Sequence, residues 1–238
     1  MHDESITRSS PSDALPKICP VGQRQYPECV SREGKPRLRT LEEVVALPRR
    51  SPLAAELERA LSAASLLHGF RSDLAPVPVR PTSTISEAGA YRFRFRDPID
   101  LRVSRVGDRV ALGFLHELAH LLDHQIYYER KTRKWASHVH LAFAAWRTAI
   151  TSLEPRKLPG GSGRQRYFQA VHEIWARSYA QTVLLRSGDA HLQAQLIKLQ
   201  SEDDPHVWPA EQFAPVAIEL ERVFERLGLT QLTLPLAA

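Results

Sequence analysis

Residues 115–123 read Leu-His-Glu-Leu-Ala-His-Leu-Leu-Asp and lie within a longer, mostly apolar segment, residues 109–128. Apolar side chains recur on nearly every side of this segment when it is placed on a helix, and a helix of that kind is buried. We therefore expect residues 109–128 to form the central helix of the domain. His116, Glu117 and His120 are polar exceptions in it, and burying them is unfavourable unless each has a partner.

The spacing of these three polar residues is that of a zinc-binding motif. On a helix, His116 and His120 lie one turn apart on the same face, so both imidazoles can bind one Zn²⁺. Glu117 lies beside them, where a glutamate can act as general base toward a metal-activated water. The alternative is that the three side chains only partner one another. The pattern favours a zinc-dependent peptidase, in which three protein ligands and one open position surround the metal.

The third metal ligand is not expected on the same helix. A metzincin would have Gly at position 123 and His at position 126, where this chain has Asp123 and Ile126. His124 is eight residues from His116, about 12 Å along a helix, so one ion cannot contact both. Asp123 indicates either a hydrogen bond that supports a ligand or a charge near the surface. The third ligand is therefore expected on another helix.

Glu173 is the best candidate for that ligand, because it is a glutamate on an otherwise apolar helix predicted over residues 165–186. A buried glutamate needs a cation or a strong hydrogen-bond donor. A salt bridge to Arg177, four residues further on, is the alternative explanation. His172 and Glu154 are weaker substitutes as ligands. The sequence thus predicts Glu173 as the third ligand.

Together, the His-Glu-x-x-His motif and the stretch Glu-Ile-Trp-Ala-Arg-Ser-Tyr-Ala at residues 173–180 resemble the gluzincin class of zinc metallopeptidases. The chain is similar in particular to families whose third ligand opens a Glu-x-x-Ala helix. These are the anthrax lethal factor-like proteases and the small cytoplasmic, repressor-cleaving peptidases of mobile elements. The resemblance covers the two motifs and their order, within residues 91–187. It implies zinc held by the two histidines of the motif and Glu173, with Glu117 as the base.

Stabilising the transition state requires a hydrogen-bond donor opposite the metal, and such enzymes often use Tyr or His for it. Tyr167 is the first candidate, since it lies six residues before Glu173 and next to a glycine-rich loop. Tyr127, Tyr128 and His172 are alternatives. For each of the four, a packing or surface role is the competing explanation.

Residues 91–96 alternate aromatic residues with arginines, which predicts a half-buried strand. The arginines favour an ordinary exposed sheet face over a phosphate-binding stripe, because aromatic side chains that could stack on bases point the other way. A second alternating run, residues 99–106, follows, so a small sheet is expected ahead of the central helix. The first strand can form an edge along which an extended peptide substrate adds.

Much of the remaining chain has helical periodicity. Helices are expected over residues 41–47, 52–67, 135–150, 165–186, 190–199 and 210–227. Residues 72–90 contain three prolines and indicate an extended connection. The fold class predicted is α+β, a mostly helical zincin-like domain with a small antiparallel sheet before the metal-binding helix. Residues 1–40 are predicted to be an irregular N-terminal segment, and residues 41–238 a single domain.

Composition places further bounds on the protein. The chain of 238 residues is 43% hydrophobic and 25% charged, which is ordinary for a globular protein. Its apolar runs fall short of the about 18 residues of a transmembrane helix, and its first residues do not resemble a signal peptide. With only Cys19 and Cys29 present, we expect a reduced, cytoplasmic protein. A disulfide between these two cysteines is the alternative.

The partner expected from these features is a protein or peptide substrate, with no membrane contact. The formal net charge of +5 permits nucleic-acid binding without favouring it, because the excess is moderate and spread out. Two other functions stay open on the sequence alone. One is a catalytically inactive zincin-fold binding protein, and the other is a basic nucleic-acid-binding protein with a structural metal. The sequence indicates no oligomeric state.

Overall fold

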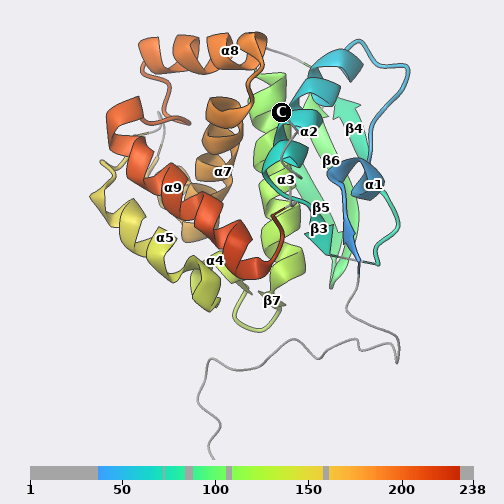
Figure 1. The fold of residues 1–238 in the computed structure, drawn as a ribbon. Coiled ribbons are helices and arrows are strands. Elements are labelled where there is room, and N and C mark those ends of the chain that lie inside the picture. The colour runs from blue at the N-terminus through green and yellow to red at the C-terminus, as the bar shows by residue number, and fades with distance from the viewer. Residues whose placement is uncertain (1–36, 72, 84–87, 106–108, 158–160, 231–238) are drawn as a thin grey trace, which may run out of the picture.

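A computed structural model describes residues 37–71, 73–83, 88–105, 109–157 and 161–230. Cys19, Cys29 and most of the segment predicted to be irregular, residues 1–40, lie outside the described residues. The α+β class is confirmed. A small sheet lies on one side of the central helix, and several of the other helices lie on its opposite side (Figure 1).

The elements follow one another in an order that places most strands before the central helix. The strands are β1 Leu38–Arg39, β2 Val45–Ala46, β3 Phe70–Arg71, β4 Val77–Thr82, β5 Gly89–Arg94, β6 Asp97–Ser104, β7 Tyr128–Glu129 and β8 Lys134–Trp135. The α-helices are α1 Leu41–Val44, α2 Ala54–Leu67, α3 Val110–Ile126, α4 Ala136–Val139, α5 Ala144–Ala149, α6 Ser162–Phe168, α7 Val171–Arg186, α8 Ala190–Ser201 and α9 Ala210–Leu227. Short 3₁₀ turns, Leu141–Phe143 and Ile150–Ser152, flank α5.

Four strands form the main sheet, in the order β2-β4-β6-β5. β5 and β6 pair antiparallel, as predicted, with Tyr91 opposite Leu101. β4 pairs parallel to both β2 and β6, so the sheet is mixed and larger than the predicted strand pair. The inner face of β6 carries Leu101 and Val103, which are fully buried, and β6 packs against α3. The sheet therefore supports the helix that carries the His-Glu-x-x-His motif.

β4 corrects the prediction that residues 72–90 are only an extended connection. Val77 and Val79 alternate with Pro78 and Arg80 and are buried, as expected for one face of a strand. Pro78 and Pro81 adopt extended backbone readily but cannot donate to a neighbouring strand. β2 has two residues and pairs with β4 only at Val77 and Pro78. Most residues of β4 therefore pair with no described strand on that side and need no backbone N–H to donate to one. The prolines kept the sequence pattern from indicating a strand. The strand forms because residues 77–82 pair with β2 and β6.

The helices pack in a layer on α3. α7 and α2 both pack directly against α3, and α9 packs against α7 and α5 (Figure 1). The core is formed by large buried side chains from these helices, among them Phe114, Trp146, Trp175 and Phe224. Within the described residues, no helix combines the length and apolar character needed to cross a membrane.

The helix predicted over residues 135–150 is broken at His140, which is extended with ψ 137°. The His140 ring accepts from the Ala142 backbone N–H at 3.2 Å and begins the following 3₁₀ turn. Arg147 donates to the carbonyls of Ser137 and His140, at 3.1 Å in each case. These side-chain bonds satisfy backbone groups freed by the break, and hydrophobic periodicity does not register them.

The helix predicted over residues 165–186 is also divided, into α6 and α7. Ala170 is extended with ψ 144° and precedes the first residue of α7. Arg177 donates to the carbonyl of Phe168 at 2.8 Å, which satisfies the end of α6. The break places Glu173 in the first turn of α7, where the helix dipole favours a carboxylate.

His68 is a buried titratable residue on the far side of the core, at the end of α2. Its Nδ1 lies 2.8 Å from the carbonyl of Gly69, so Nδ1 carries the proton, and Nε2 accepts from the Tyr179 hydroxyl at 2.8 Å. The ring also stacks on Phe224, with centroids 4.2 Å apart. Burial lowers the pKa of His68 to about 4 from an ordinary 6.5.

We expect this histidine to make the protein less stable in acid. Between pH 6.5 and 4 the unfolded chain binds a proton at His68 that the folded protein rejects, so the free energy of unfolding falls as the pH falls. The loss between pH 7 and 4.5 is about 2 kcal/mol for this residue. Urea unfolding measures the free energy of unfolding at the two pH values. Its decrease from pH 7 to 4.5 should be smaller in His68→Gln than in the parent protein by about 2 kcal/mol. An unchanged decrease would assign the acid sensitivity to other groups.

Candidate metal centre

The residues predicted on two distant parts of the chain lie together where α3 packs against α7. His116 and His120 come from α3, and Glu173 comes from α7. Trp175 Nε1 donates to the backbone carbonyl of Ala119 at 3.2 Å, inside the core. This bond holds α7 beside the turn of α3 that carries His120.

Two imidazole nitrogens and the two oxygens of one carboxylate face one another in this cluster. His116 Nε2 lies 3.1 Å from His120 Nε2. Glu173 Oε2 lies 3.2 Å from His116 Nε2, and Glu173 Oε1 lies 3.3 Å from His120 Nε2. A tetrahedral zinc ion with ligands at about 2.0–2.1 Å holds neighbouring ligand atoms about 3.3 Å apart. The separations therefore fit a single ion, and the two histidines and the glutamate can hold one metal.

The cluster is largely buried and leaves one carboxylate oxygen of Glu173 without a hydrogen bond from any residue that the structure describes. His120 is 6% exposed and Glu173 is 4% exposed, whereas the His116 side chain is 19% exposed and leaves one side open. Glu173 Oε1 makes no hydrogen bond within the described residues, although it lies near His120. A buried charged oxygen without a hydrogen bond is unfavourable by about 1–3 kcal/mol or more. A metal ion bound by Glu173 would remove that cost.

The charges in the cluster reinforce one another. Burial alone would raise the pKa of Glu173, but His120 and His116 hold it well below its ordinary value. Burial would likewise lower the pKa of His120, but the carboxylates of Glu173 and Glu117 outweigh it and raise the pKa to about 9. Glu173 is thus ionised, as a ligand must be, and a metal competes with a proton for His120.

Glu117 lies on the sheet side of α3, against β5. Burial raises its pKa, and the neighbouring charges of His116 and His120 partly oppose this effect. The backbone N–H of Tyr91 donates to its carboxylate. A Cβ added at Gly89 would lie 2.5 Å from Glu117 Cγ and 2.7 Å from Glu117 Oε1, closer than atoms can approach. A larger residue at position 89 would therefore force the Glu117 side chain or β5 to shift, a constraint that no sequence pattern indicated.

The two polar residues that follow the motif serve other purposes. Asp123 is fully buried, and its two oxygens accept from the backbone N–H and the hydroxyl of Ser137, both at 2.6 Å. The expectation of a charge near the surface is wrong for Asp123, because its carboxylate anchors the start of α4.

His124 lies outside the cluster, as predicted. Its ring contacts the Tyr91 hydroxyl at 2.9 Å and the Phe95 carbonyl at 3.0 Å.

An aromatic wall borders the cluster on the α7 side. The His172 ring stacks on Trp135, with centroids 5.4 Å apart and planes inclined by 4°. His172 Nε2 lies 3.5 Å from Glu173 Oε1. The Tyr167 and His172 rings contact each other edge to face, with centroids 5.9 Å apart. Tyr167 is 55% exposed. Tyr128 makes an edge-to-face contact with Trp135, with ring centroids 5.6 Å apart. Trp135 was predicted only as a helix start, and nothing in its neighbourhood along the chain points to this position.

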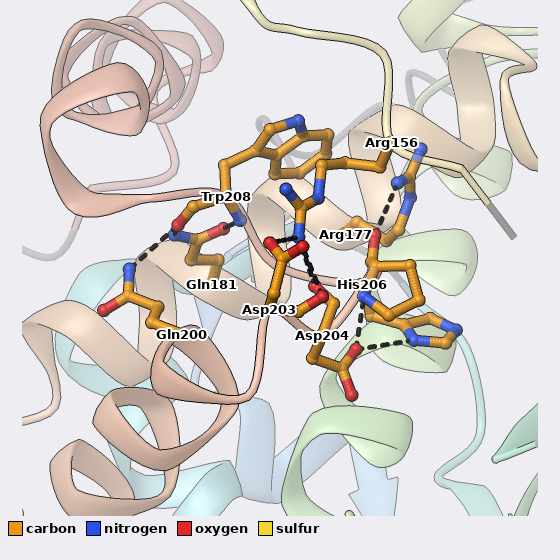
Figure 2. A network of polar contacts seen from close by, with 9 residues as sticks. Arg156, Arg177, Gln181, Gln200, Asp203, Asp204, His206 and Trp208 are labelled. Atoms are coloured by element: carbon orange, nitrogen blue, oxygen red, sulfur yellow. Dashed lines mark hydrogen bonds and ion pairs between the residues drawn. The ribbon is translucent and has the colours of Figure 1, made fainter.

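The alternatives considered for Glu173 have different surroundings. Arg177 donates to the backbone carbonyls of Glu173 and Phe168, at 3.3 and 2.8 Å, and forms no ion pair with the Glu173 carboxylate within the described part of the chain. Its guanidinium lies over the rings of Phe168, 3.6 Å from the centroid, and Trp208, 4.7 Å from the centroid. Figure 2 shows Arg177 and Trp208 within a network of polar contacts. Glu154 is exposed, in the segment that follows α5. Arg177 thus secures the start of α7 and leaves the Glu173 carboxylate to the histidines.

Comparisons of the chain with protein-family models, with curated protein sequences and with solved structures returned no match. The assignment of the site therefore depends on the geometry described above.

Proposed function

We propose that the protein is a zinc-dependent endopeptidase of the gluzincin type. The observation that carries this proposal is the set of separations between His116, His120 and Glu173, which are those of a tetrahedral site. A His₂Glu ligand set with a neighbouring glutamate is also the donor set of zinc peptidases. The motif on α3, a sheet before it and a third ligand from a later helix all support the same class.

Zinc bound here would act as a Lewis acid and lower the pKa of a water molecule toward neutrality. The chain's own residues supply the proton transfer. Glu117, one residue from a ligand, is placed to take the proton of the attacking water and to hold it in a largely buried position. Burial raises the pKa of Glu117, which makes the carboxylate a stronger base. The same proton can then pass to the leaving amine.

β5 is the edge strand next to Glu117 and is proposed to bind the substrate. It pairs with β6 on one side, and within the described residues no strand pairs with its other side. Gly89 and Tyr91 bring it into contact with Glu117. An extended protein or peptide substrate that added to this edge would lie beside the base.

Tyr167 remains the proposed donor to the developing oxyanion, with His172 as the alternative. Both lie at the aromatic wall beside Glu173, since Tyr167 contacts the His172 ring and His172 Nε2 lies 3.5 Å from Glu173 Oε1. Mutagenesis separates the two candidates. Substitution of the residue that acts in the transition state should lower kcat with little effect on zinc binding.

The metal content tests the proposal first. Protein purified with zinc present and then dialysed is expected to contain one zinc per chain, because three protein ligands hold it. His116→Ala and Glu173→Ala should each lose most of this zinc. Elemental analysis by plasma mass spectrometry measures it. Glu154→Gln is the matched control, an exposed glutamate that should leave the stoichiometry at one. Zinc-free parent protein, or full zinc in Glu173→Ala, would refute the assignment.

A further inference from the structure

The outer face of the main sheet carries a group of arginines arranged around one buried carboxylate. Asp100 on β6 is fully buried, and Arg92 on β5 donates to it with both Nε, at 2.6 Å, and Nη2. Arg80 on β4 places Nε 3.2 Å from the same carboxylate, and Arg102 on β6 places Nε at 3.8 Å. We call Arg80, Arg92, Arg94 and Arg102 the arginine face.

Strand geometry directs these side chains away from the core. Leu101 and Val103 alternate with Arg102 on β6 and are fully buried on the inner face. Arg80 pairs directly with Arg102 in the register of β4 and β6. The side chains of Arg80, Arg92 and Arg102 are 65%, 43% and 31% exposed, so their guanidinium groups are available to a partner although Asp100 orients them.

The charge on this face is not balanced within the sheet. One carboxylate is matched by the bidentate bond to Arg92, which already satisfies both of its oxygens. Arg80, Arg102 and Arg94 therefore add positive charge that Asp100 does not neutralise. Asp100 instead preorganises its neighbours, which lowers the entropy lost when a rotamer-rich arginine binds an anion.

We propose that the arginine face binds the phosphate backbone of a nucleic acid without reading its sequence. Guanidinium groups match phosphate oxygens, and contacts of this kind give affinity without base specificity. Tyr91 and Phe93 point inward to His124, so the face lacks the row of aromatic rings on which successive bases stack. Phe95 is exposed after the end of β5, where the guanidinium groups of Arg94 and Arg130 lie over its ring. An acidic protein is the less favoured partner, because the centre of a protein interface is usually apolar and aromatic.

Fluorescence anisotropy with a labelled 20-base-pair DNA duplex tests this proposal across a range of salt concentrations. Three phosphate contacts, from Arg80, Arg94 and Arg102, predict a slope of log K against log salt of about −2.7. Arg80→Gln with Arg102→Gln should make the slope shallower by about 2 and weaken binding at least about 10-fold at 50 mM salt. Arg92 is kept, because its loss would leave Asp100 buried without its main partner. Arg80→Gln alone, at the most exposed position, should remove about one unit of slope and serves if the double variant does not fold.

The matched control is Arg186→Gln with Arg222→Gln, which removes the same charge from α7 and α9, where both arginines pair with surface glutamates. Unchanged binding in this control supports a local site. Equal losses in the two double variants, or no salt-dependent binding by the parent protein, would overturn the proposal. Displacement by poly-glutamate at lower concentration than by unlabelled duplex would also overturn it, in favour of an acidic polypeptide. None of these results depends on zinc or on peptide hydrolysis.

Discussion

Glutamine in place of Glu117 is expected to reduce peptide hydrolysis by about 10²–10⁴-fold, because the side chain keeps its shape but can no longer take a proton. Zinc should remain at one per chain, since Glu117 is not among the three clustered ligands. Hydrolysis of an unfolded protein substrate by the parent and Glu117→Gln, followed by mass spectrometry of the products, measures the effect. Products that appear only with the parent protein would also identify the cleavage specificity.

Two comparisons make the Glu117 result decisive. Glu154→Gln is the control for the same chemical change at an exposed glutamate, and it should keep full activity. Full activity in Glu117→Gln would contradict the role of Glu117 as base. A loss of activity together with a loss of zinc would show that Glu117 is structural. An inactive parent protein that nonetheless binds zinc would point to a zincin-fold binding protein.

Alanine at Gly89 is expected to lower kcat by about 10²-fold through displacement of Glu117, because a misplacement of about 1 Å at a catalytic group has effects of this size. The added Cβ would lie 2.5 Å from Glu117 Cγ, so either the carboxylate or β5 must shift. Zinc content should stay unchanged. Steady-state kinetics on a fluorogenic peptide and metal analysis of the same sample measure both quantities.

Gly163→Ala is the matched control for this substitution. A Cβ at Gly163, on α6, meets no atom within 4 Å, so kcat and KM should equal those of the parent protein. If Gly89→Ala kept full kcat, Glu117 would not need its observed position beside β5. If the variant instead raised KM alone, the result would favour a role of the strand in binding substrate over a role in placing the base.

Local patterns accounted for the main elements around the site. The periodicity of residues 109–128 corresponds to α3, and the alternation in residues 91–96 and 99–106 corresponds to the hairpin of β5 and β6. Glu173 stood out because a glutamate on an apolar helix needs a partner, and it lies against the two histidines. These features depend on a few neighbouring residues, which is why they could be predicted.

Other features depend on contacts between distant residues and could not be predicted in this way. β4 became a strand because β2 and β6 lie beside it, despite its prolines. The breaks at His140 and Ala170 depend on Arg147 and Arg177, whose bonds to backbone carbonyls replace helical ones. The contact of Gly89 with Glu117 joins a strand and a helix, and no local pattern contains it.

The sequence by itself therefore determined the His-Glu-x-x-His motif, the central helix and the choice of Glu173 as a candidate ligand, because helical spacing and the cost of burying charge are properties of short segments. Only the tertiary structure decided that the nearest ligand atoms of each pair among His116, His120 and Glu173 lie 3.1–3.3 Å apart, since that requires the Trp175 bond to Ala119 and the start of α7 after Ala170. It also decided that the arginines of β4, β5 and β6 share one face around Asp100. Register between strands depends on contacts between distant residues. It places arginines that are far apart in the sequence on the same face of the sheet.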